Sequence, residues 1–398
     1  MTLRPAEPSA YSALPSESQI PHLASLIESW NALPARTHLI PTVENGVTVR
    51  VALHERGSGH RDRVLVLIHG VLADHQTWRY LGGALGQEYD LWLIDLPGCG
   101  ASDKPDAETL GPDGYSPRAM ASRVMQAVQT RLEASDTPPR LLVVGHSLGG
   151  MTALRAFADQ EISARHARVI QQVDGLVLLS PSDVMIHQEI PLFVRVIELK
   201  SWETAIGQSL GVLAPMIAQG SIENTSYPEF VTREEVDRFI AILTNGDTRR
   251  AAQAMLRQAV PWNEKAHLPN WAEMKRIEQG YRHVQVPCQI LWGKFDQTLP
   301  VSMGYKLAWQ LPNGRLTVLP DCMHSAQIEC PLDCARLIRE FDRKLASSAD
   351  EFEFLFADHS EPRIVELDRV NEGLMSRLAG FEQMPTLPAR KPVHAQKK

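Results

Sequence analysis

The chain has 398 residues, of which 44% are hydrophobic and 22% charged, and its formal net charge is −7. This balance supplies apolar material for a large core, and no long basic run is present, so nucleic acid is not an expected partner. No window approaches the roughly 18 apolar residues of a membrane span, and the N-terminus lacks the apolar core of a signal peptide, so we expect a cytoplasmic protein. The five cysteines fit a reducing compartment rather than a disulfide scaffold.

An N-terminal extension and a hairpin come first along the chain. Residues 1–36 are rich in Pro and Ser and contain one helical pattern, HLASLIESW. The segment THLIPTVENGVTVRVALHERG, residues 37–57, predicts a β hairpin that turns at Asn45 and Gly46, because Asn-Gly is a frequent two-residue hairpin turn. The hairpin gives the predicted sheet an antiparallel start.

Six short apolar runs follow the hairpin and predict buried strands. They lack polar alternation, which is typical of a parallel sheet covered on both faces by helices. Helical patterns lie between the runs, as βαβ crossovers require. The six runs are Val64–Gly70, Leu91–Gly98, Leu141–Ser147, Val173–Asp183, Cys288–Asp296 and Arg315–Asp321.

The alternation of strands and helices stops between the fourth and the fifth run. Residues 184–283 hold no convincing strand but contain several amphipathic helical patterns, so we expect a helical insertion there. The last segment combines the apolar DEFEFLF, a helical pattern near Arg369–Leu378 and a Pro- and Lys-rich end that we expect to be disordered. The sequence therefore predicts five segments. They are an N-terminal extension (residues 1–36), the first part of the core (37–183), the helical insertion (184–283), the second part of the core (284–347) and a C-terminal extension (348–398).

The sequence LLVVGHSLGG places Ser147 between a predicted strand and a predicted helix. Gly145, Ser147 and Gly149 match the pattern G-x-S-x-G of a nucleophile elbow. The residues two positions to either side must be small, because the tight turn brings the backbones together. A hydroxyl presented at the N-terminus of a helix indicates nucleophilic catalysis by Ser147.

A serine hydroxyl needs a base, and three histidines follow the last predicted strands. His324 lies in the loop DCMHSAQIECP directly after such a strand and is the expected base, whereas His359 and His394 lie in the C-terminal extension. Asp296, at the end of the preceding strand, is the favoured acid to orient it. Asp183, at the end of an earlier strand, stays open as the alternative acid.

The oxyanion that forms when an acyl carbon is attacked needs two preorganised donors. One is expected to be the backbone N–H of Leu148, directly after the nucleophile. The other is expected from Val71 in the loop after the first buried strand, where Gly70 lets the backbone approach.

Other polar residues beside these motifs are interpreted as structural. We expect His69 to shape the loop that carries Val71, and His146 to pack against the elbow. Asp95 is expected to hold the turn DLPGCG by accepting hydrogen bonds from backbone N–H groups, with Cys99 as an inert neighbour. Around His324 the cysteine spacing fits no compact C-x-x-C ligand pair, so we expect no metal at Cys322, Cys330 and Cys334.

Five motifs together resemble those of the α/β-hydrolase superfamily, in the branch with a helical cap. They are HGVLADHQTW, DLPGCGASDKP, GHSLGG, LWGKFDQTLP and MHS, in this order within residues 37–347. The resemblance implies an α/β fold with a mostly parallel eight-stranded sheet, helices on both faces, a cap inserted after the sixth strand and a Ser-His-Asp triad. Serine at the elbow argues against the branches that use an aspartate to open epoxides or carbon–halogen bonds.

The residues predict a serine hydrolase that cleaves a carboxylic ester or a related acyl bond of a small, apolar substrate, without a metal or an organic cofactor. The same groups serve C–C bond hydrolysis, lactone opening and acyl transfer, which stay open as alternatives. A non-catalytic ligand receptor on this fold is disfavoured, because all three triad candidates are present. The cap and the C-terminal extension are the expected surfaces for association into a homo-oligomer.

Overall fold

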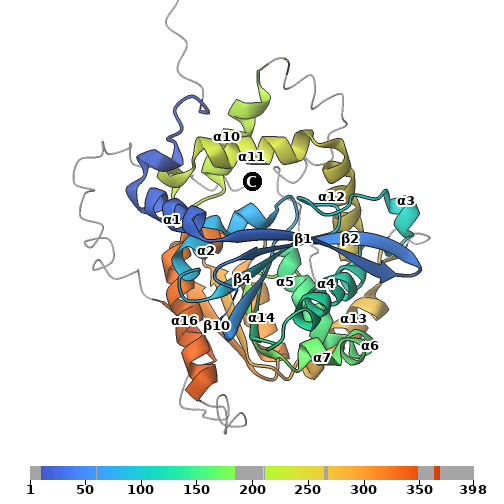
Figure 1. Ribbon diagram of the computed structural model, residues 1–398. Helices are drawn as coiled ribbons and strands as arrows, with labels where there is room; N and C mark the ends of the chain where they lie inside the picture. The colour runs from blue at the N-terminus through green and yellow to red at the C-terminus, as the bar shows by residue number, and fades with distance from the viewer. Residues whose placement is uncertain are drawn as a thin grey trace, which may run out of the picture.

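The computed structural model describes residues 10–59, 61–183, 209, 211–263, 268–347 and 363–367. A nine-stranded sheet runs through its centre in the order β1-β2-β4-β3-β5-β6-β9-β10-β11 (Figure 1). β2 pairs antiparallel with β1 and with β4, and all other neighbours are parallel. The strands are β1 (Ala35–Glu44), β2 (Val47–Arg56), β3 (Arg63–Ile68), β4 (Asp90–Asp95), β5 (Arg140–His146), β6 (Val173–Leu179), β9 (Cys288–Gly293), β10 (Gly314–Leu319) and β11 (Ile364–Glu366).

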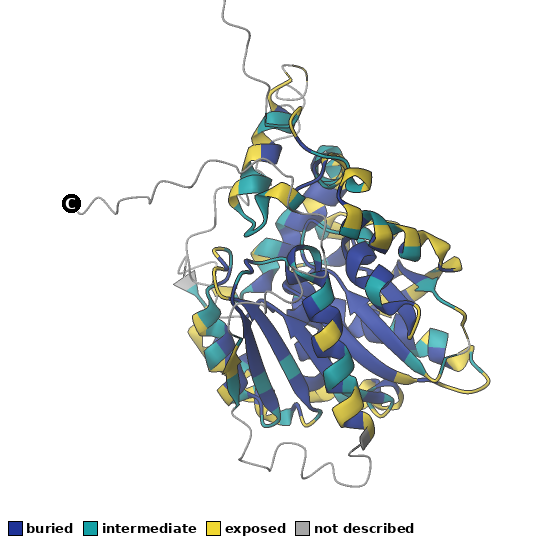
Figure 2. Cartoon of the chain, turned by 90° about the vertical axis from the view of Figure 1, so that its left-hand side faces the viewer, coloured by how far each residue is buried: buried dark blue, intermediate teal, exposed yellow. Residues whose placement is uncertain are grey.

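The predicted hairpin and all six predicted buried strands are confirmed. Asn45 and Gly46 turn the hairpin with φ angles of 51° and 75°, the left-handed values that a tight two-residue turn requires. The six inner strands β3, β4, β5, β6, β9 and β10 are buried almost throughout, whereas β1 at the edge and the outer faces of the helices carry many exposed residues (Figure 2).

Two apolar layers cover the two faces of the sheet. Along β3, Val64, Val66 and Ile68 face one layer, while Leu65 and Leu67 face the other. This alternation buries both faces of the strand, as expected for a parallel sheet between helices. The helices that precede or flank the strands are α1 (Pro21–Ala32), α2 (Arg79–Leu85), α3 (Ala107–Leu110), α4 (Pro117–Glu133), α5 (Leu148–Ala158), α6 (Gln160–Arg165), α7 (Ala167–Ile170), α14 (Val301–Gln310), α15 (Ala326–Glu329) and α16 (Pro331–Ser347), with 3₁₀ turns η1 (Glu17–Gln19) and η2 (His75–Trp78).

The expected count of eight strands is wrong, because the C-terminal extension adds a ninth. β11 pairs in parallel with β10, and Leu316 N–H donates to the Arg363 carbonyl over 2.9 Å. An edge strand leaves its N–H and C=O groups without partners, and this short segment satisfies part of that edge. The expectations for DEFEFLF, for the helical pattern near Arg369–Leu378 and for the chain end fall outside the described residues.

The helices expected after the sixth strand are present in the described part, from residue 211 onward. In Figure 1, α10 and α11 lie above the sheet and α12 runs down beside it. A two-residue antiparallel pair, β7 (Trp262–Asn263) with β8 (Leu268–Pro269), follows α12 in the chain and was not predicted from the sequence. The insertion comprises α10 (Leu213–Glu223), η4 (Pro228–Phe230), α11 (Arg233–Thr244), α12 (Gly246–Ala259), α13 (Trp271–Gly280) and η5 (Tyr281–His283). Residues 184–208, for which helix was also expected, are outside the described residues.

The N-terminal segment is packed into the body of the molecule. Helix α1 crosses α2 so closely that a Cβ on Gly83 would lie 2.1 Å from the Leu26 carbonyl oxygen, and one on Gly82 would lie 2.4 Å from the Trp30 ring. Trp30 is 2% exposed and belongs to the apolar layer on that face of the sheet. Across the described residues, no helix combines the length and the apolar character needed to cross a membrane.

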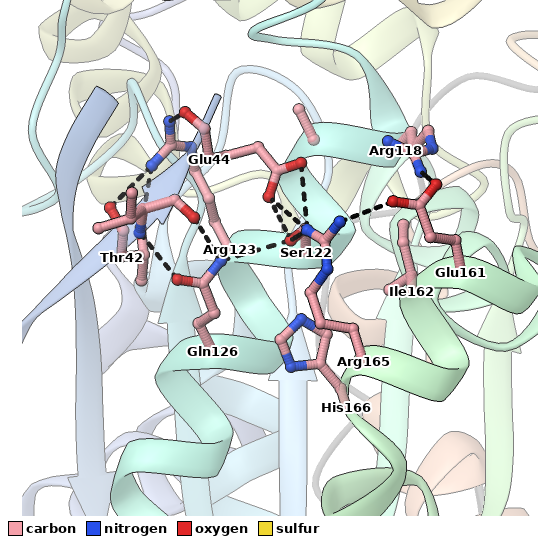
Figure 3. A network of polar contacts seen from close by, with 12 residues as sticks. Thr42, Glu44, Arg118, Ser122, Arg123, Gln126, Glu161, Ile162, Arg165 and His166 are labelled. Carbon is pink, nitrogen blue, oxygen red and sulfur yellow. Dashed lines mark hydrogen bonds and ion pairs between the residues drawn. The ribbon is translucent and has the colours of Figure 1, made fainter. Parts of the chain in front are cut away.

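A buried guanidinium fastens the hairpin to α4 (Figure 3). Arg123 donates to the Thr42 carbonyl over 2.9 Å and to the Val47 carbonyl over 3.1 Å, and burial lowers its pKa. Beside it, the Glu44 carboxylate accepts hydrogen bonds from Ser122 Oγ and from Arg165 Nη1, over 2.5 and 3.1 Å. Because backbone carbonyls at the hairpin end bind this charge, β1 and β2 are held at the edge of the sheet.

Candidate active site

Ser147 occupies a strained turn between β5 and α5. Its φ of 51° lies in the left-handed region, which a residue with a side chain rarely adopts. Its N–H donates to the Leu179 carbonyl over 3.0 Å, which ties the turn to the end of β6. A Cβ on Gly145 would lie 2.7 Å from the Gly149 carbonyl oxygen, and one on Gly149 would lie 2.1 Å from the Ile68 carbonyl oxygen. The two small residues of the motif are therefore required by close backbone contacts.

His324 and Asp296 lie together at the carboxyl ends of β10 and β9. His324 Nδ1 is 2.8 Å from Asp296 Oδ2. The other carboxylate oxygen, Oδ1, accepts the backbone N–H groups of Thr298 and Leu299 over 2.9 and 2.8 Å. The two backbone bonds fix the carboxylate, so that its free oxygen can orient the imidazole and leave Nε2 available.

Asp183, the alternative acid, is engaged elsewhere. Its Oδ1 accepts the Tyr281 hydroxyl over 2.7 Å, and both side chains are buried. Burial and the neighbouring Asp183 charge raise the pKa of Tyr281 well above its ordinary value. The structure thus brings Asp296, and not Asp183, to the imidazole of His324.

His146 holds the loop of His324 against the elbow. Its Nε2–H donates to the His324 backbone carbonyl over 3.0 Å, and its Nδ1 faces the Gln327 amide at 3.3 Å. The two imidazole rings are 4.9 Å apart between centroids. Burial and the neighbouring His324 lower the pKa of His146 well below its ordinary value, which favours the neutral ring. His146 therefore links the elbow to the His324 loop through hydrogen bonds.

A second hydroxyl beside the elbow was missed in the sequence. Ser182 Oγ lies 3.4 Å from Ser147 Oγ, and the Ser182 N–H donates to the Ser147 carbonyl over 2.9 Å. Both side chains are buried. Its position three residues after β6 was the available signal, because the ends of neighbouring parallel strands meet at one edge of the sheet.

The loop after β3 lies directly against the elbow. A Cβ on Gly70 would lie 3.0 Å from the Ser147 Cβ, so the backbone that leads into Val71 packs against the elbow. Leu148 is the first residue of α5, where helical N–H groups have no acceptor within the helix. His69 shapes this loop: its Nδ1–H donates to the Gly70 carbonyl over 2.7 Å, its Nε2 accepts the Leu96 N–H over 3.0 Å, and burial lowers its pKa.

The described residues contain one group of three metal-ligating side chains whose ligand atoms lie within 4.8 Å of one another: His54, His75 and Asp95. Each imidazole already has two partners, because His54 also contacts Thr37 Oγ1 at 2.8 Å and His75 also contacts the Gln76 amide at 2.8 Å. Burial by itself would raise the pKa of Asp95, but the hydrogen bonds from His54 and His75 lower it well below its usual range. We interpret the group as a hydrogen-bonded clamp.

Asp95 also holds its turn through a backbone N–H of that turn. Ala101 N–H donates to its Oδ2 over 2.7 Å, as the sequence predicted for the turn DLPGCG. The cysteines near His324 have free thiols, and the neighbouring Cys322 and Cys334 thiols lower the pKa of Cys330 to about 6. Within the described residues their sulfur atoms form no group of the kind that His54, His75 and Asp95 form.

Apolar side chains of the insertion cover the loop after Val71. Leu72, whose φ is 54°, and Leu14 from the N-terminal segment belong to the same cluster. The buried members contributed by α10, α11 and α12 and the turn before α11 are Leu213, Ile217, Ala218, Val231, Val236, Leu243 and Ala252. Val71 also packs against this cluster, so aliphatic groups of the insertion lie against the loop that follows β3.

The fold and this arrangement define a hydrolase of the α/β class. The chain belongs to the alpha/beta hydrolase fold family, whose sequence model matches residues 63–331. It is similar to monoacylglycerol lipase ABHD6 of Homo sapiens, with 26% identity over 310 residues that cover 74% of this chain and 82% of the relative. It is also similar to a 2-hydroxy-6-oxononadienedioate/2-hydroxy-6-oxononatrienedioate hydrolase of Burkholderia vietnamiensis, with 25% identity over 322 residues, covering 78% and 96%.

Solved structures share the fold. A putative lipase (lip1) from Acinetobacter baumannii superposes with a TM-score of 0.58 and 18% identity, covering 87% of this chain and all of that one. The esterase RhEst1 from Rhodococcus gives a TM-score of 0.57 and 19% identity, with 78% and 99% covered.

Proposed function

We propose that the chain is a serine hydrolase that cleaves a carboxylic ester, with Ser147, His324 and Asp296 as its triad. The observation that supports this best is the 2.8 Å contact between His324 Nδ1 and Asp296 Oδ2, in a loop that His146 holds beside the strained Ser147. A carboxylate on one imidazole nitrogen leaves the other nitrogen to serve as the base for a neighbouring hydroxyl.

The proposed reaction follows from these positions. His324 takes the proton of Ser147 Oγ as that oxygen attacks the ester carbonyl carbon, and the N–H groups of Val71 and Leu148 bind the oxyanion. The proton then passes to the leaving alkoxide, which departs as an alcohol and leaves an acyl-enzyme. Water, deprotonated by His324, attacks the acyl carbon and releases the acid and free Ser147. Asp296 orients the imidazole and stabilises its positive charge throughout.

The proposed substrate carries an apolar acyl chain of modest size. The aliphatic cluster of Leu72 with α10–α12 packs against Val71, the proposed oxyanion residue, and burying a CH₂ group contributes about 0.8 kcal/mol. The similarity to monoacylglycerol lipase ABHD6 supports the same substrate class.

We further propose that residues 184–283 form a cap over the site, inserted between core segments 37–183 and 284–347. Support comes from the contact of α12 with the turn after β4: a Cβ on Gly98 would lie 2.4 Å from the Ala251 Cβ and 3.1 Å from the Met255 methyl carbon.

Hydrolysis of a C–C bond is the second candidate reaction. It is favoured by the similarity to the Burkholderia vietnamiensis enzyme, of whose length the alignment covers 96%.

A single set of measurements tests the proposal. Purified protein is reacted with a fluorophosphonate, the labelled residue is found by mass spectrometry, and turnover is measured on 4-nitrophenyl esters of increasing acyl length. We expect the label on Ser147 and the highest kcat/KM for an acyl chain of modest length. Absence of labelling and of ester turnover would refute the proposed activity, and turnover only of a vinylogous 1,5-diketone would favour the C–C hydrolase.

A further inference from the structure

Glu329, the last residue of α15, is a buried carboxylate that the proposed triad does not use. It is 7% exposed, and burial raises its pKa. Carboxylates are rarely buried unless hydrogen bonds compensate for the lost hydration. Its contacts are therefore informative about what it holds.

Two of its hydrogen bonds go to the residues on either side of His324. Oε2 accepts the Met323 N–H over 3.1 Å, and Oε1 accepts the Ser325 N–H over 3.0 Å. One rigid carboxylate group thus spans the backbone that carries the proposed base. Together with Asp296 on the ring and His146 on the carbonyl, it fixes this loop from a third direction.

The other two bonds go to the insertion. Oε2 also accepts the Ser226 N–H over 2.9 Å and the Thr225 hydroxyl over 3.2 Å. These residues lie in the turn between α10 and η4, and Phe230 of η4 packs in the same apolar cluster as Ile328 of α15. The same oxygen therefore contacts both the His324 loop and the segment that leads into the helices above the site.

The partners of Glu329 select its charged form. Three of the four groups that face its oxygens are backbone N–H groups, which can only donate, and the fourth is the Thr225 hydroxyl, which donates to a charged carboxylate and would have to turn to accept from a protonated one. Hydrogen bonds to an ionised acceptor are roughly twice as strong as neutral ones. A charged Glu329 can hold both segments in place, whereas a neutral isostere cannot satisfy all four donors.

We propose that Glu329 is a positioning residue that sets the orientation of His324 and couples it to the seating of the insertion. This inference rests on the proposed function, because His324 must be the base for its position to matter. A displacement of about 1 Å in a reacting group lowers the rate by roughly 100-fold, so loss of one of these bonds is expected to affect the chemical step.

The test is the rate at which a fluorophosphonate labels Ser147 in Glu329→Gln, compared with the parent protein. Gln has the same shape as Glu, but one of its two terminal atoms is an NH₂ group, which cannot accept a hydrogen bond. We expect the NH₂ group to take the place of Oε1, because only the bond from the Ser325 N–H is then lost. We expect the maximal labelling rate to fall about 10- to 100-fold while the concentration for half-maximal rate stays within about twofold, since the approach to Ser147 is unchanged.

Asp333→Asn is the matched control. Asp333 is a buried carboxylate on α16 whose pKa burial raises, and it pairs with Arg336 on its own helix rather than with the His324 loop. It is expected to label at the rate of the parent protein. All rates are measured at a temperature at which thermal melts show each variant to be folded; if Glu329→Gln does not fold, Glu329→Asp replaces it.

The outcomes separate the two proposals. If the parent protein is not labelled at Ser147, the proposed function fails. If the parent is labelled and the Glu329 variant is labelled at the same maximal rate, the positioning role is wrong. If Asp333→Asn loses as much rate as the Glu329 variant, the loss reflects a general effect of buried carboxylates near α16, and the positioning role is again wrong.

Discussion

Ser147 shows how strain at one residue is held by its neighbours. A residue with a side chain at a φ of 51° costs on the order of 1–3 kcal/mol. The turn persists because Leu179 accepts its N–H while the Ser182 N–H and the Met151 N–H donate to its carbonyl. The strained geometry presents the hydroxyl at the start of α5, where the helix dipole stabilises negative charge.

Replacing Ser147 by Ala or by Gly should separate chemistry from strain. Both variants lose the nucleophile, and we expect turnover to fall by several orders of magnitude in each. Gly adopts positive φ without a steric penalty, so Ser147→Gly should be more stable than Ser147→Ala by about 1 kcal/mol. Chemical denaturation measures this difference. Equal stability of the two variants would show that the turn stores no strain, and turnover of Ser147→Ala within about tenfold of the parent would remove Ser147 from the mechanism.

Asp296→Asn should cost rate while preserving the fold. The Asn carbonyl oxygen can still accept the Thr298 and Leu299 N–H groups, but its NH₂ then faces His324 and favours the wrong tautomer. We expect kcat to fall on the order of 10³- to 10⁴-fold with an unchanged thermal melt. Asp183→Asn is the control, because it can still accept from Tyr281 and should keep most of the rate. The reverse ranking would make Asp183 the acid.

At the scale of elements, the strands and turns that could be predicted are those that a local sequence pattern determines. Apolar runs identified the six buried strands to within a few residues, and Asn45-Gly46 identified the hairpin. The triad candidates could be named from the sequence because Ser147 and Asp296 end predicted strands and His324 directly follows one. Strand β11 could not be predicted, because Ile364–Glu366 is too short to show a periodicity and its partner β10 lies far away in the sequence. The contacts of Glu329 and Ser182 could not be predicted either, because no motif marks these residues and the loops that they join meet only after folding.

Removing residues 348–398 should reduce stability without changing the chemistry. The deletion takes away β11, including Ile364 and the neighbouring Leu367, which pack against the two apolar layers. Loss of these partly buried side chains and of the edge pairing is expected to cost about 2 kcal/mol. A thermal melt gives the loss, and fluorophosphonate titration gives turnover per active site. Reduced turnover per active site with an unchanged melt would place the extension in the active site.

At the scale of the whole molecule, one buried charge joins three parts of the chain. Arg79, which is 3% exposed on α2, donates to Glu17 of the N-terminal segment and to Glu235 of α11. Burial by itself would lower the pKa of Arg79, but Glu235 and Glu17 raise it above its ordinary value. Burial by itself would likewise raise the pKa of Glu235, but the charges of Arg79 and Arg238 lower it.

The stabilisation by Glu235 should therefore depend on pH. Because its folded pKa lies below the unfolded value of about 4.3, its contribution is fully present at neutral pH and is lost as pH falls through the folded pKa. We expect Glu235→Gln to cost about 1–3 kcal/mol at pH 7 and progressively less toward about pH 3, measured by denaturant unfolding. Glu273→Gln, which breaks an ion pair with Arg276 at the surface of α13, should cost under about 1 kcal/mol. A gap between parent and Glu235→Gln that stays constant with pH would contradict the ion-pair role.

The same charge has a consequence for how the protein is made. Glu17 precedes Arg79 by 62 residues, whereas Glu235 follows it by 156. At about 5–20 residues per second, a ribosome needs roughly 8 to 30 s to travel from Arg79 to Glu235. During that time Glu17 is the partner already synthesised, so the N-terminal segment can neutralise the guanidinium on the nascent chain. Residues 10–33 would then pack against α2 before α11 has been synthesised. Helix α11 would pack against both segments once it leaves the ribosome.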